Sequence, residues 1–166
     1  MDRRRNRAEK LFMEADQLIK DKKIPEALDV LHECIEIYPD FGKAYNHLGW
    51  IHDVKLGNVQ EADTNYQLAL KYSPEYRAVY YNYAVILSVS KRYRELDELL
   101  QKASTVAGIN MGTIYNEYAI MHESQQYYEQ AIEYYQKYIG ELFNDNNINN
   151  AMAAIERCRR KMNIMR

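Results

Sequence analysis

The histidines and cysteines are the side chains with the chemistry for catalysis or metal binding, and their spacing argues against both. His32 and Cys34 are two residues apart, so on a helix they face different sides and cannot pair locally as base and nucleophile. His47 and His52 are five residues apart, whereas a metal-binding pair on one helix face is spaced by four. The pattern therefore predicts no metal site, and we expect no cofactor.

One acid–base combination remains, formed by His122 and Glu123 with Glu117 nearby. Such a histidine could act as a general base that a carboxylate orients. The sequence provides no companion nucleophile, and its 6 glycines are scattered rather than gathered into a phosphate-binding loop. A solvated helix face is the simpler interpretation. We expect no catalytic residues and no enzymatic activity.

Charge is unevenly distributed along the 166 residues, whose formal net charge is −2. Residues 1–10 carry five Lys or Arg against two acids, and residues 157–166 carry five against none, so the segment between them is acidic. An acidic body repels a nucleic-acid backbone, which argues against a nucleic-acid partner. The basic residues near the C-terminus also suit the negative end of a helix dipole.

The hydrophobic pattern and the cysteines bear on the compartment. No apolar run approaches the roughly 18 residues that a membrane-spanning helix needs. The basic start is followed by an amphipathic pattern rather than by the apolar centre of a signal peptide. Cys34 and Cys158 lie far apart and form no disulfide framework, which agrees with a reducing environment. We expect a cytoplasmic protein without a membrane partner.

A fixed period organises most of the chain. Ala27 and Ala62 are 35 residues apart, and Ala131 follows after 69 more, which leaves room for an intervening unit centred on Leu96. A second landmark recurs in step as Leu48-Gly49, Tyr83-Ala84 and Tyr118-Ala119, and a third as Leu31, Tyr66, Leu100 and Tyr135. Apolar residues at intervals of three and four around these positions predict amphipathic helices.

This pattern resembles the tetratricopeptide repeat, a helical hairpin of about 34 residues. Four units are visible, near 8–41, 42–76, 77–111 and 112–145, within a single domain over 1–166. The resemblance implies an all-α fold, a right-handed solenoid of stacked antiparallel helix pairs. The third unit departs from the pattern with Leu96 in place of alanine, and the second carries one extra residue between its helices.

The expected helix ends follow from capping residues. Ser73 with Pro74 is typical of a helix start, and Asp40 and Asn58 are similar candidate caps. Asn residues dominate 144–150, which predicts a turn. A ninth helix follows, from Ala151 to about residue 162 within a segment of about 147–164, and we expect it to cover the apolar end of the last repeat.

The resemblance also implies a concave groove lined by the first helix of each unit, where peptides bind. The groove positions would be Phe12, Asp16, Asn46, His47, Trp50, Asp53, Tyr81, Asn82, Val85, Asn116, Glu117, Ile120 and Glu123. An Asn amide can both donate to and accept from a peptide backbone. Trp50 is the only tryptophan, and as an anchor it could contribute about 2 kcal/mol or more. The alternative is that the ninth helix or a neighbouring side chain covers it.

Charge at these positions bears on the partner. The chaperone-binding subclass of the family clamps a terminal carboxylate with Lys, Asn and Arg side chains, but the matching positions here are Phe12, Asp16, His47, Ala78 and Asn82. The cationic half of that clamp is missing. The acids at groove positions favour a neutral or basic segment; they are Asp16, Asp53, Glu117 and Glu123.

The leading hypothesis is therefore a non-enzymatic scaffold or adaptor that binds a peptide or protein segment in the groove. A second is an assembly subunit or homo-oligomer that associates through the C-terminal half, which is rich in tyrosine: twelve of the 16 tyrosines lie from Tyr76 onward. Exposed tyrosine is enriched at interfaces. A third is a secretion-type chaperone, for which the sequence offers no evidence.

Overall fold

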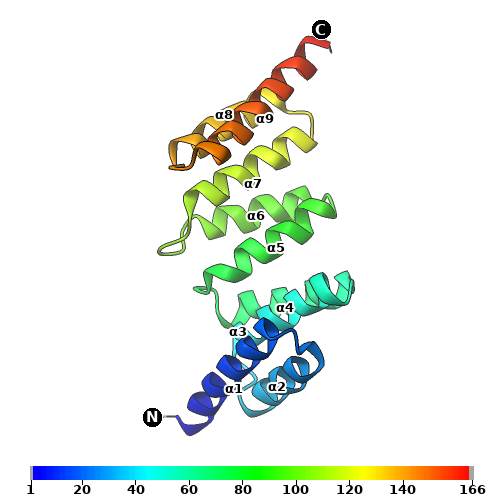
Figure 1. Ribbon diagram of the computed structural model, residues 1–166, viewed down its shortest axis with the longest axis vertical. Helices are drawn as coiled ribbons and strands as arrows, with labels where there is room; N and C mark the ends of the chain where they lie inside the picture. Colours follow the sequence, from blue (N-terminus) through cyan, green and yellow to red (C-terminus); the bar gives the residue numbers. More distant parts are fainter. Residues whose placement is uncertain (1, 165–166) are drawn as a thin grey trace. The chain divides into compact units, whose positions relative to one another are not determined.

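The computed structural model describes residues 2–164, and within them helices are the only regular secondary structure (Figure 1). The prediction of an all-α fold is confirmed. The helices are α1 (Arg3–Lys20), α2 (Ile24–Ile37), α3 (Gly42–Trp50), η1 (Ile51–Lys55), α4 (Val59–Tyr72), α5 (Arg77–Val89), α6 (Tyr93–Ala103), α7 (Met111–Ser124), α8 (Tyr128–Gly140) and α9 (Asp145–Ile164). Among the described residues, no helix combines the length and apolar character needed to cross a bilayer.

The chain divides into two compact units, and the division falls within α5. Unit 1 comprises residues up to 86, and unit 2 starts at residue 87. Each unit is built from antiparallel helix pairs: α1 with α2 and α3 with α4 in unit 1, and α7 with α8 in unit 2, where α9 packs on α8.

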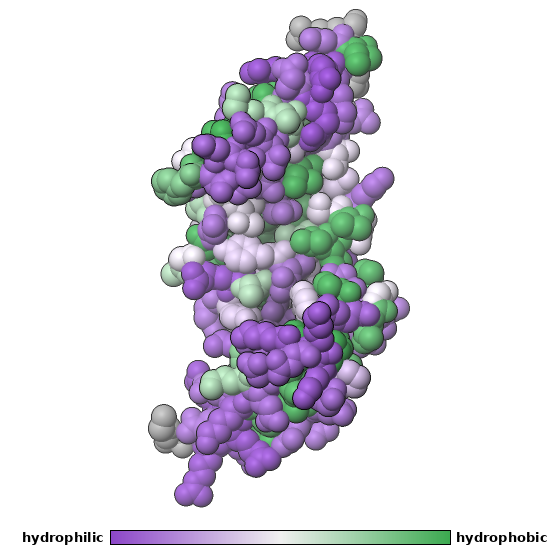
Figure 2. Space-filling view, viewed as in Figure 1, coloured by the Kyte–Doolittle hydropathy of each residue, from purple (hydrophilic) through white to green (hydrophobic). Residues whose placement is uncertain are grey.

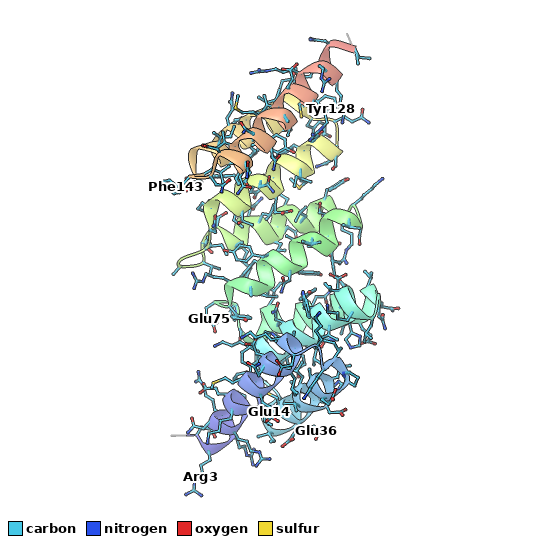
Figure 3. The ribbon with its side chains drawn as sticks, viewed as in Figure 1. Arg3, Glu14, Glu36, Glu75, Tyr128 and Phe143 are labelled. Atoms are coloured by element: carbon cyan, nitrogen blue, oxygen red, sulfur yellow. The ribbon has the colours of Figure 1, made fainter. Side chains whose placement is uncertain are left out.

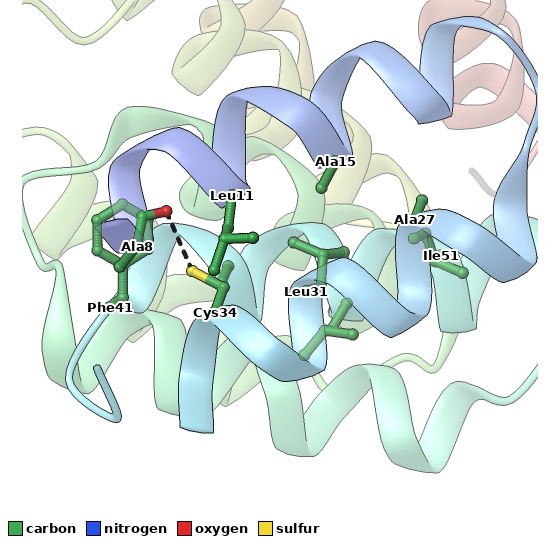
Figure 4. Packing of buried hydrophobic residues seen from close by; sticks show 10 residues of the cluster. Ala8, Leu11, Ala15, Ala27, Leu31, Cys34, Phe41 and Ile51 are labelled. Atoms are coloured by element: carbon green, nitrogen blue, oxygen red, sulfur yellow. Dashed lines mark hydrogen bonds between the residues drawn. The ribbon is translucent and has the colours of Figure 1, made fainter. Parts of the chain in front are cut away.

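The core of unit 1 is formed by the stripe that the sequence predicts. Ala27, Leu31 and Cys34 on α2 are completely buried, and they face Ala8 and other small or apolar residues of α1 (Figure 4). The Cys34 thiol donates a hydrogen bond of 3.3 Å to the Ala8 carbonyl oxygen. Burial raises the pKa of Cys34 to about 11, so this thiol is a packing residue rather than a nucleophile.

A glycine brings α3 and α4 into close contact. A Cβ atom on Gly49 would lie 2.8 Å from Cδ1 and 2.8 Å from Cε1 of Tyr66, and the Tyr66 side chain is fully buried. The ring occupies the space that a side chain at position 49 would need. The absence of a side chain at Gly49 therefore lets the two helices approach closely.

The extra residue of the second repeat appears as a π-helical turn. The helix that starts as α3 continues into η1, where the N–H of Leu56 donates to the carbonyl oxygen of Ile51 at 3.1 Å. A five-residue hydrogen-bonded spacing absorbs one inserted residue without breaking the helix. Gly57 then takes a positive φ of 64°, and the Asn58 side chain caps α4 by accepting from the N–H of Glu61 at 3.2 Å, as predicted.

Two of the predicted helix starts are wrong. Ser73 ends α4 instead of starting α5, because its N–H donates to the carbonyl oxygen of Ala69 at 2.8 Å. Pro74 lies in the following turn, where its carbonyl oxygen accepts the Tyr80 hydroxyl at 2.7 Å, so the chain reverses before α5 begins. Asp40 likewise lies in a turn, and Phe41 directly precedes α3.

The predicted Asn-rich turn is also wrong beyond its first residue. Asn144 caps α9, since its side-chain oxygen accepts from the N–H groups of Asn146 at 2.9 Å and Asn147 at 3.3 Å. The helix therefore starts at Asp145, and the remaining asparagines form its first turns. The expected covering role of this helix is observed, because Ile155 and Cys158 are buried against α8.

One carboxylate in unit 2 joins three helices. Glu123 at the end of α7 accepts two hydrogen bonds of 2.7 Å from Arg157 of α9 and one of 2.9 Å from the Tyr135 hydroxyl of α8. The Lys161 ammonium lies 3.3 Å away. The Arg157 guanidinium, with smaller contributions from Tyr135 and Lys161, lowers the pKa of Glu123 from 4.5 to about 2. The basic C-terminal segment thus attaches α9 to the repeats.

We predict that Gly49→Ala destabilises unit 1 by about 1 to 3 kcal/mol, because the new methyl group displaces the buried Tyr66 ring. The matched control is Gly140→Ala in α8, where a Cβ has no neighbour within 4 Å. The free energy of unfolding of Gly140→Ala should differ from that of wild type by no more than about 1 kcal/mol. Any change should be stabilising, because alanine favours a helix more than glycine does. Thermal and urea unfolding followed by circular dichroism measures both. Equal stability of Gly49→Ala and wild type would contradict the packing.

We predict that the attachment of α9 weakens at low pH. Since the pKa of Glu123 is lower in the folded state, its contribution, roughly 3 kcal/mol, is complete above pH 4.5 and is lost as the pH falls towards 2. Hydrogen exchange of α9 amides should therefore differ strongly between wild type and Glu123→Gln at pH 6, and the difference should shrink on acidification. Glu129→Gln, an exposed change on α8, is the control. A difference that persists unchanged at pH 2 would refute this role.

Candidate functional site

A pocket in unit 1 gathers several of the predicted groove residues. Its volume is about 240 Å³, and its walls come from α1, α3, α5 and the turn before α5. The lining residues are Ile19, Asn46, His47, Trp50, Tyr76, Ala78 and Asn82. Four of these, Asn46, His47, Trp50 and Asn82, are predicted groove positions, and the structure brings them together in this pocket.

Two asparagines form the polar part of the pocket. The side-chain amide of Asn82 donates to the side-chain oxygen of Asn46 at 3.1 Å, although the two residues lie 36 positions apart in the sequence. Asn46 is only 2% exposed. Within the described residues, the remaining Asn46 amide hydrogens and the Asn82 oxygen have no hydrogen-bond partner. The pair therefore offers one donor and one acceptor side by side.

Trp50 provides the largest apolar wall. The residue is half-buried and lies at the end of α3, directly before the π-helical turn. The Lys55 ammonium from that turn lies 5.1 Å from the centroid of the indole ring. A neighbouring side chain, Lys55, thus contacts Trp50. This contact is part of the alternative in which a neighbouring side chain covers Trp50, but the indole ring still lines the pocket.

Phe12, Asp16 and His47 form a connected group beside the pocket. The Phe12 ring lies 4.5 Å from the His47 ring. His47 Nε2 lies 3.4 Å from a carboxylate oxygen of Asp16, whose other oxygen accepts from the Lys20 ammonium at 2.6 Å. The Lys20 hydrogen bond lowers the pKa of Asp16. Burial lowers the pKa of His47, and Asp16 partly offsets this effect.

The other predicted groove residues of unit 1 do not line this pocket. Asp53 is half-buried in the π-helical turn. Tyr81 lines an adjoining hollow of about 540 Å³ together with Lys43 and Glu75. Val85 is 50% exposed.

In unit 2 the predicted groove residues lie on α7, where they behave differently from one another. Asn116, Glu117 and Ile120 are half-buried, and burial raises the pKa of Glu117 above its usual 4.5. The Glu123 carboxylate binds Arg157 and Lys161, so it attaches α9 and is not available to a ligand.

Sequence reasoning missed three pocket residues as groove positions, Ile19, Tyr76 and Ala78. Ile19 lies three residues after Asp16 and therefore shares its helix face, so the spacing could have identified it. Ala78 lies one turn before Asn82 on α5, which is the same kind of indication. Tyr76 precedes α5 in a turn, and no helical periodicity predicts where a turn residue points.

The acid–base arrangement considered for His122 is not formed. Its ring lies parallel to Tyr134, with 5.4 Å between centroids and 17° between planes, while Glu123 binds Arg157. In the part of the chain that the structure describes, no three His, Cys, Asp or Glu side chains form a group that could hold a metal ion.

One face of the molecule is mostly hydrophilic. Figure 2 shows polar residues over most of the face drawn, with apolar residues in separate patches. Among the exposed apolar side chains is Phe143, in the loop between α8 and α9, which projects away from the helices (Figure 3).

Sequence comparison relates the chain to a known repeat. The profile of the tetratricopeptide repeat matches residues 42–76 and 112–140. Heat shock protein STI1 of Saccharomyces cerevisiae is 44% identical over 50 residues, which are 30% of this chain and 8% of that protein. A TPR repeat-containing protein of Rhizobium etli is 31% identical over 93 residues, 56% of this chain and 43% of that protein. The chain thus spans less than half of either curated relative.

Solved structures share the fold over nearly the whole chain. PilF of Pseudomonas aeruginosa superimposes with a TM-score of 0.83 at 20% identity, covering 96% of this chain and 72% of that one. TTC0263, a TPR protein of Thermus thermophilus, superimposes with a TM-score of 0.62 at 15% identity, covering 89% and 81%. At these identities the likeness establishes the fold alone. With two matched repeats and antiparallel helix pairs in both units, the chain contains tetratricopeptide repeats and has an all-α solenoid fold.

Proposed function

We propose that this chain is a non-enzymatic adaptor that holds one apolar side chain of a partner segment in the unit 1 pocket. A tetratricopeptide-repeat fold supports a protein-interaction role in general. The specific proposal comes from the pocket formed by Trp50, Asn46 and Asn82.

The observation that carries the proposal is the free donor and acceptor of the Asn46–Asn82 pair next to Trp50. An extended peptide presents an N–H and a C=O at every residue, so an amide pair of this kind can bind its backbone without reading the side chains. Next to it the indole offers apolar contact. A dry cavity of about 150 Å³ is enough for benzene, so about 240 Å³ accommodates one aromatic or branched aliphatic side chain.

The charges around the pocket favour a neutral segment. Asp16 is the acidic residue that contacts a pocket residue, and its carboxylate is already bound to Lys20. The pocket therefore carries little net charge. A basic segment remains compatible only if its charged residues lie outside the pocket, where water and salt screen them.

The tyrosine-rich C-terminal half is not favoured as an assembly surface. Among the described tyrosines from Tyr76 onward, Tyr127 is the only exposed one, with an exposed fraction of 53%. Others are buried between packed helices, among them Tyr118, Tyr128 and Tyr135. These rings stabilise the repeats.

As the compartment we propose the cytoplasm, because Cys34 and Cys158 are both free and buried thiols.

The proposal is tested with peptides selected from a random library on the immobilised protein. Trp50 is the only tryptophan, so its fluorescence emission reports directly on pocket occupancy. We predict that the selected peptides shift this emission and that Asn82→Ala weakens them about tenfold. Trp50→Ala should weaken them about thirtyfold or more by titration calorimetry, since a tryptophan anchor is worth about 2 kcal/mol or more.

The matched control is Met13→Ala, which truncates an exposed apolar residue of α1 outside the pocket. Its affinity should equal that of wild type, and circular dichroism should show the same helicity for all variants. Peptides that bind Trp50→Ala and Asn82→Ala as tightly as wild type would reject the pocket as the binding site.

A further inference from the structure

Unit 2 contains a second pocket that the proposed peptide site does not use. Its volume is about 340 Å³. Tyr93 and Asp97 contribute from α6, Met121 and His122 from α7, and Tyr127 from the residue directly before α8. The pocket thus combines aromatic walls with one acidic side chain.

The aromatic side of the pocket is held in place by a stack of rings. His122, Tyr134 and Tyr118 lie nearly parallel, with 5.4 Å between the first two centroids and 4.8 Å between the last two. Tyr127 stands against this stack at an angle of 52°, with its centroid 6.3 Å from that of His122. Tyr127 is 53% exposed. The stack forms a fixed wall, and Tyr127 offers a ring that a ligand can reach.

The electrostatics of the pocket are set by Asp97. Arg94 also lines the pocket, but its side chain is 90% exposed and pairs with Glu98 at 3.6 Å. Burial lowers the pKa of His122, an effect that Asp97 and Glu133 partly offset, so burial disfavours the charged form of the imidazole. No described cationic group forms an ion pair with Asp97. Its carboxylate therefore leaves the pocket negative.

The hydrogen bonds of Asp97 decide what kind of cation fits. Its Oδ2 atom accepts from the Gln101 amide at 2.7 Å, and the carboxylate is close enough to the Tyr118 hydroxyl to add to the effect of burial in raising the pKa of Tyr118. A carboxylate can accept about four hydrogen bonds, so capacity remains, although not as two wholly free oxygens. An arginine guanidinium is best satisfied by two such oxygens at once. A lysine ammonium is a compact point charge that needs only one acceptor, and its methylene stem can pack against tyrosine rings. Tyrosine faces also attract an ammonium group within about 6 Å.

We propose that this pocket binds the protonated amine of a lysine side chain on a partner protein, with the ammonium at Asp97 and the stem against Tyr127 and Tyr93. The site is separate from the Trp50 pocket, so it stands or fails independently of the proposed peptide site. It also gives the tyrosine-rich half of the chain a binding role that does not require broad exposure of its tyrosines.

The test uses a blocked Gly-Lys-Gly tripeptide and the same peptide acetylated on the lysine amine, which removes only the charge. Each is titrated into the full chain while NMR follows the ring resonances of Tyr93, His122 and Tyr127. We expect the lysine peptide to shift these resonances in a saturable way and the acetyl-lysine peptide to bind at least about tenfold more weakly.

Two variants and a control make the result specific. Asp97→Asn keeps the shape and should weaken the lysine peptide about tenfold, and Tyr127→Leu, which alters an exposed ring, should weaken it about threefold to fivefold. Glu129→Gln removes a nearby exposed acid outside the pocket and should change nothing. Circular dichroism and thermal melts verify that each variant folds.

The proposal is overturned if the two peptides bind equally, if Asp97→Asn and Tyr127→Leu both bind the lysine peptide as wild type does, or if the pocket resonances do not move up to the solubility limit of the peptide. Loss of peptide selection by Trp50→Ala has no bearing on this result, because that variant changes unit 1 only.

Discussion

Close contact between paired helices is the constraint on which the rest of this structure depends. Between α3 and α4 the contact requires the absence of a side chain at Gly49, because the buried Tyr66 ring fills that space. In the α1–α2 and α7–α8 pairs, small residues of the second helix, Ala27 and Ala131, are completely buried. Because each helix turns its small residues towards its partner, the opposite faces are released from packing. Asn46 and Trp50 lie on α3 with Gly49, so the contact at Gly49 that holds α3 against α4 also fixes the helix from which both residues line the pocket.

Periodicity predicted this arrangement well, because the spacing of the small residues is itself the packing requirement. It predicted the helix ends less well. Whether Pro74 starts a helix or lies in a turn depends on the Tyr80 hydroxyl that binds its carbonyl oxygen, and this contact exists only in the folded chain. The repeat spacing showed that the second repeat contains one inserted residue. The spacing could not show that this residue lies in a π-helical turn at Ile51–Lys55, because an insertion at any position between the two helices gives the same repeat length.

The candidate site divides in the same way. Asn46, Trp50 and Asn82 could be predicted together because they share the register of the first helices, and they line one pocket. Glu123 shares this register, but its carboxylate is bound by another helix of the protein. Arg157, 34 residues later in the sequence, binds its carboxylate, and the repeat pattern does not extend to α9, so nothing in the periodicity indicates this partner. Register predicts which face of a helix a residue occupies. Only the structure shows whether another side chain of the protein already binds that residue.

The same competition changes the meaning of the chain's acidic character. The sequence places four acids at groove positions, which favours a neutral or basic segment. The structure pairs Asp16 with Lys20 and Glu123 with Arg157, and burial raises the pKa of Glu117. A carboxylate that is already paired, or whose charged form is disfavoured by burial, attracts a cation far less than a count of acids implies. At the peptide site that we propose beside Trp50, selectivity would therefore depend on shape and on uncharged hydrogen bonds. Within the described part of unit 2, a negative charge without a cationic partner is found at Asp97, which lies outside the predicted groove.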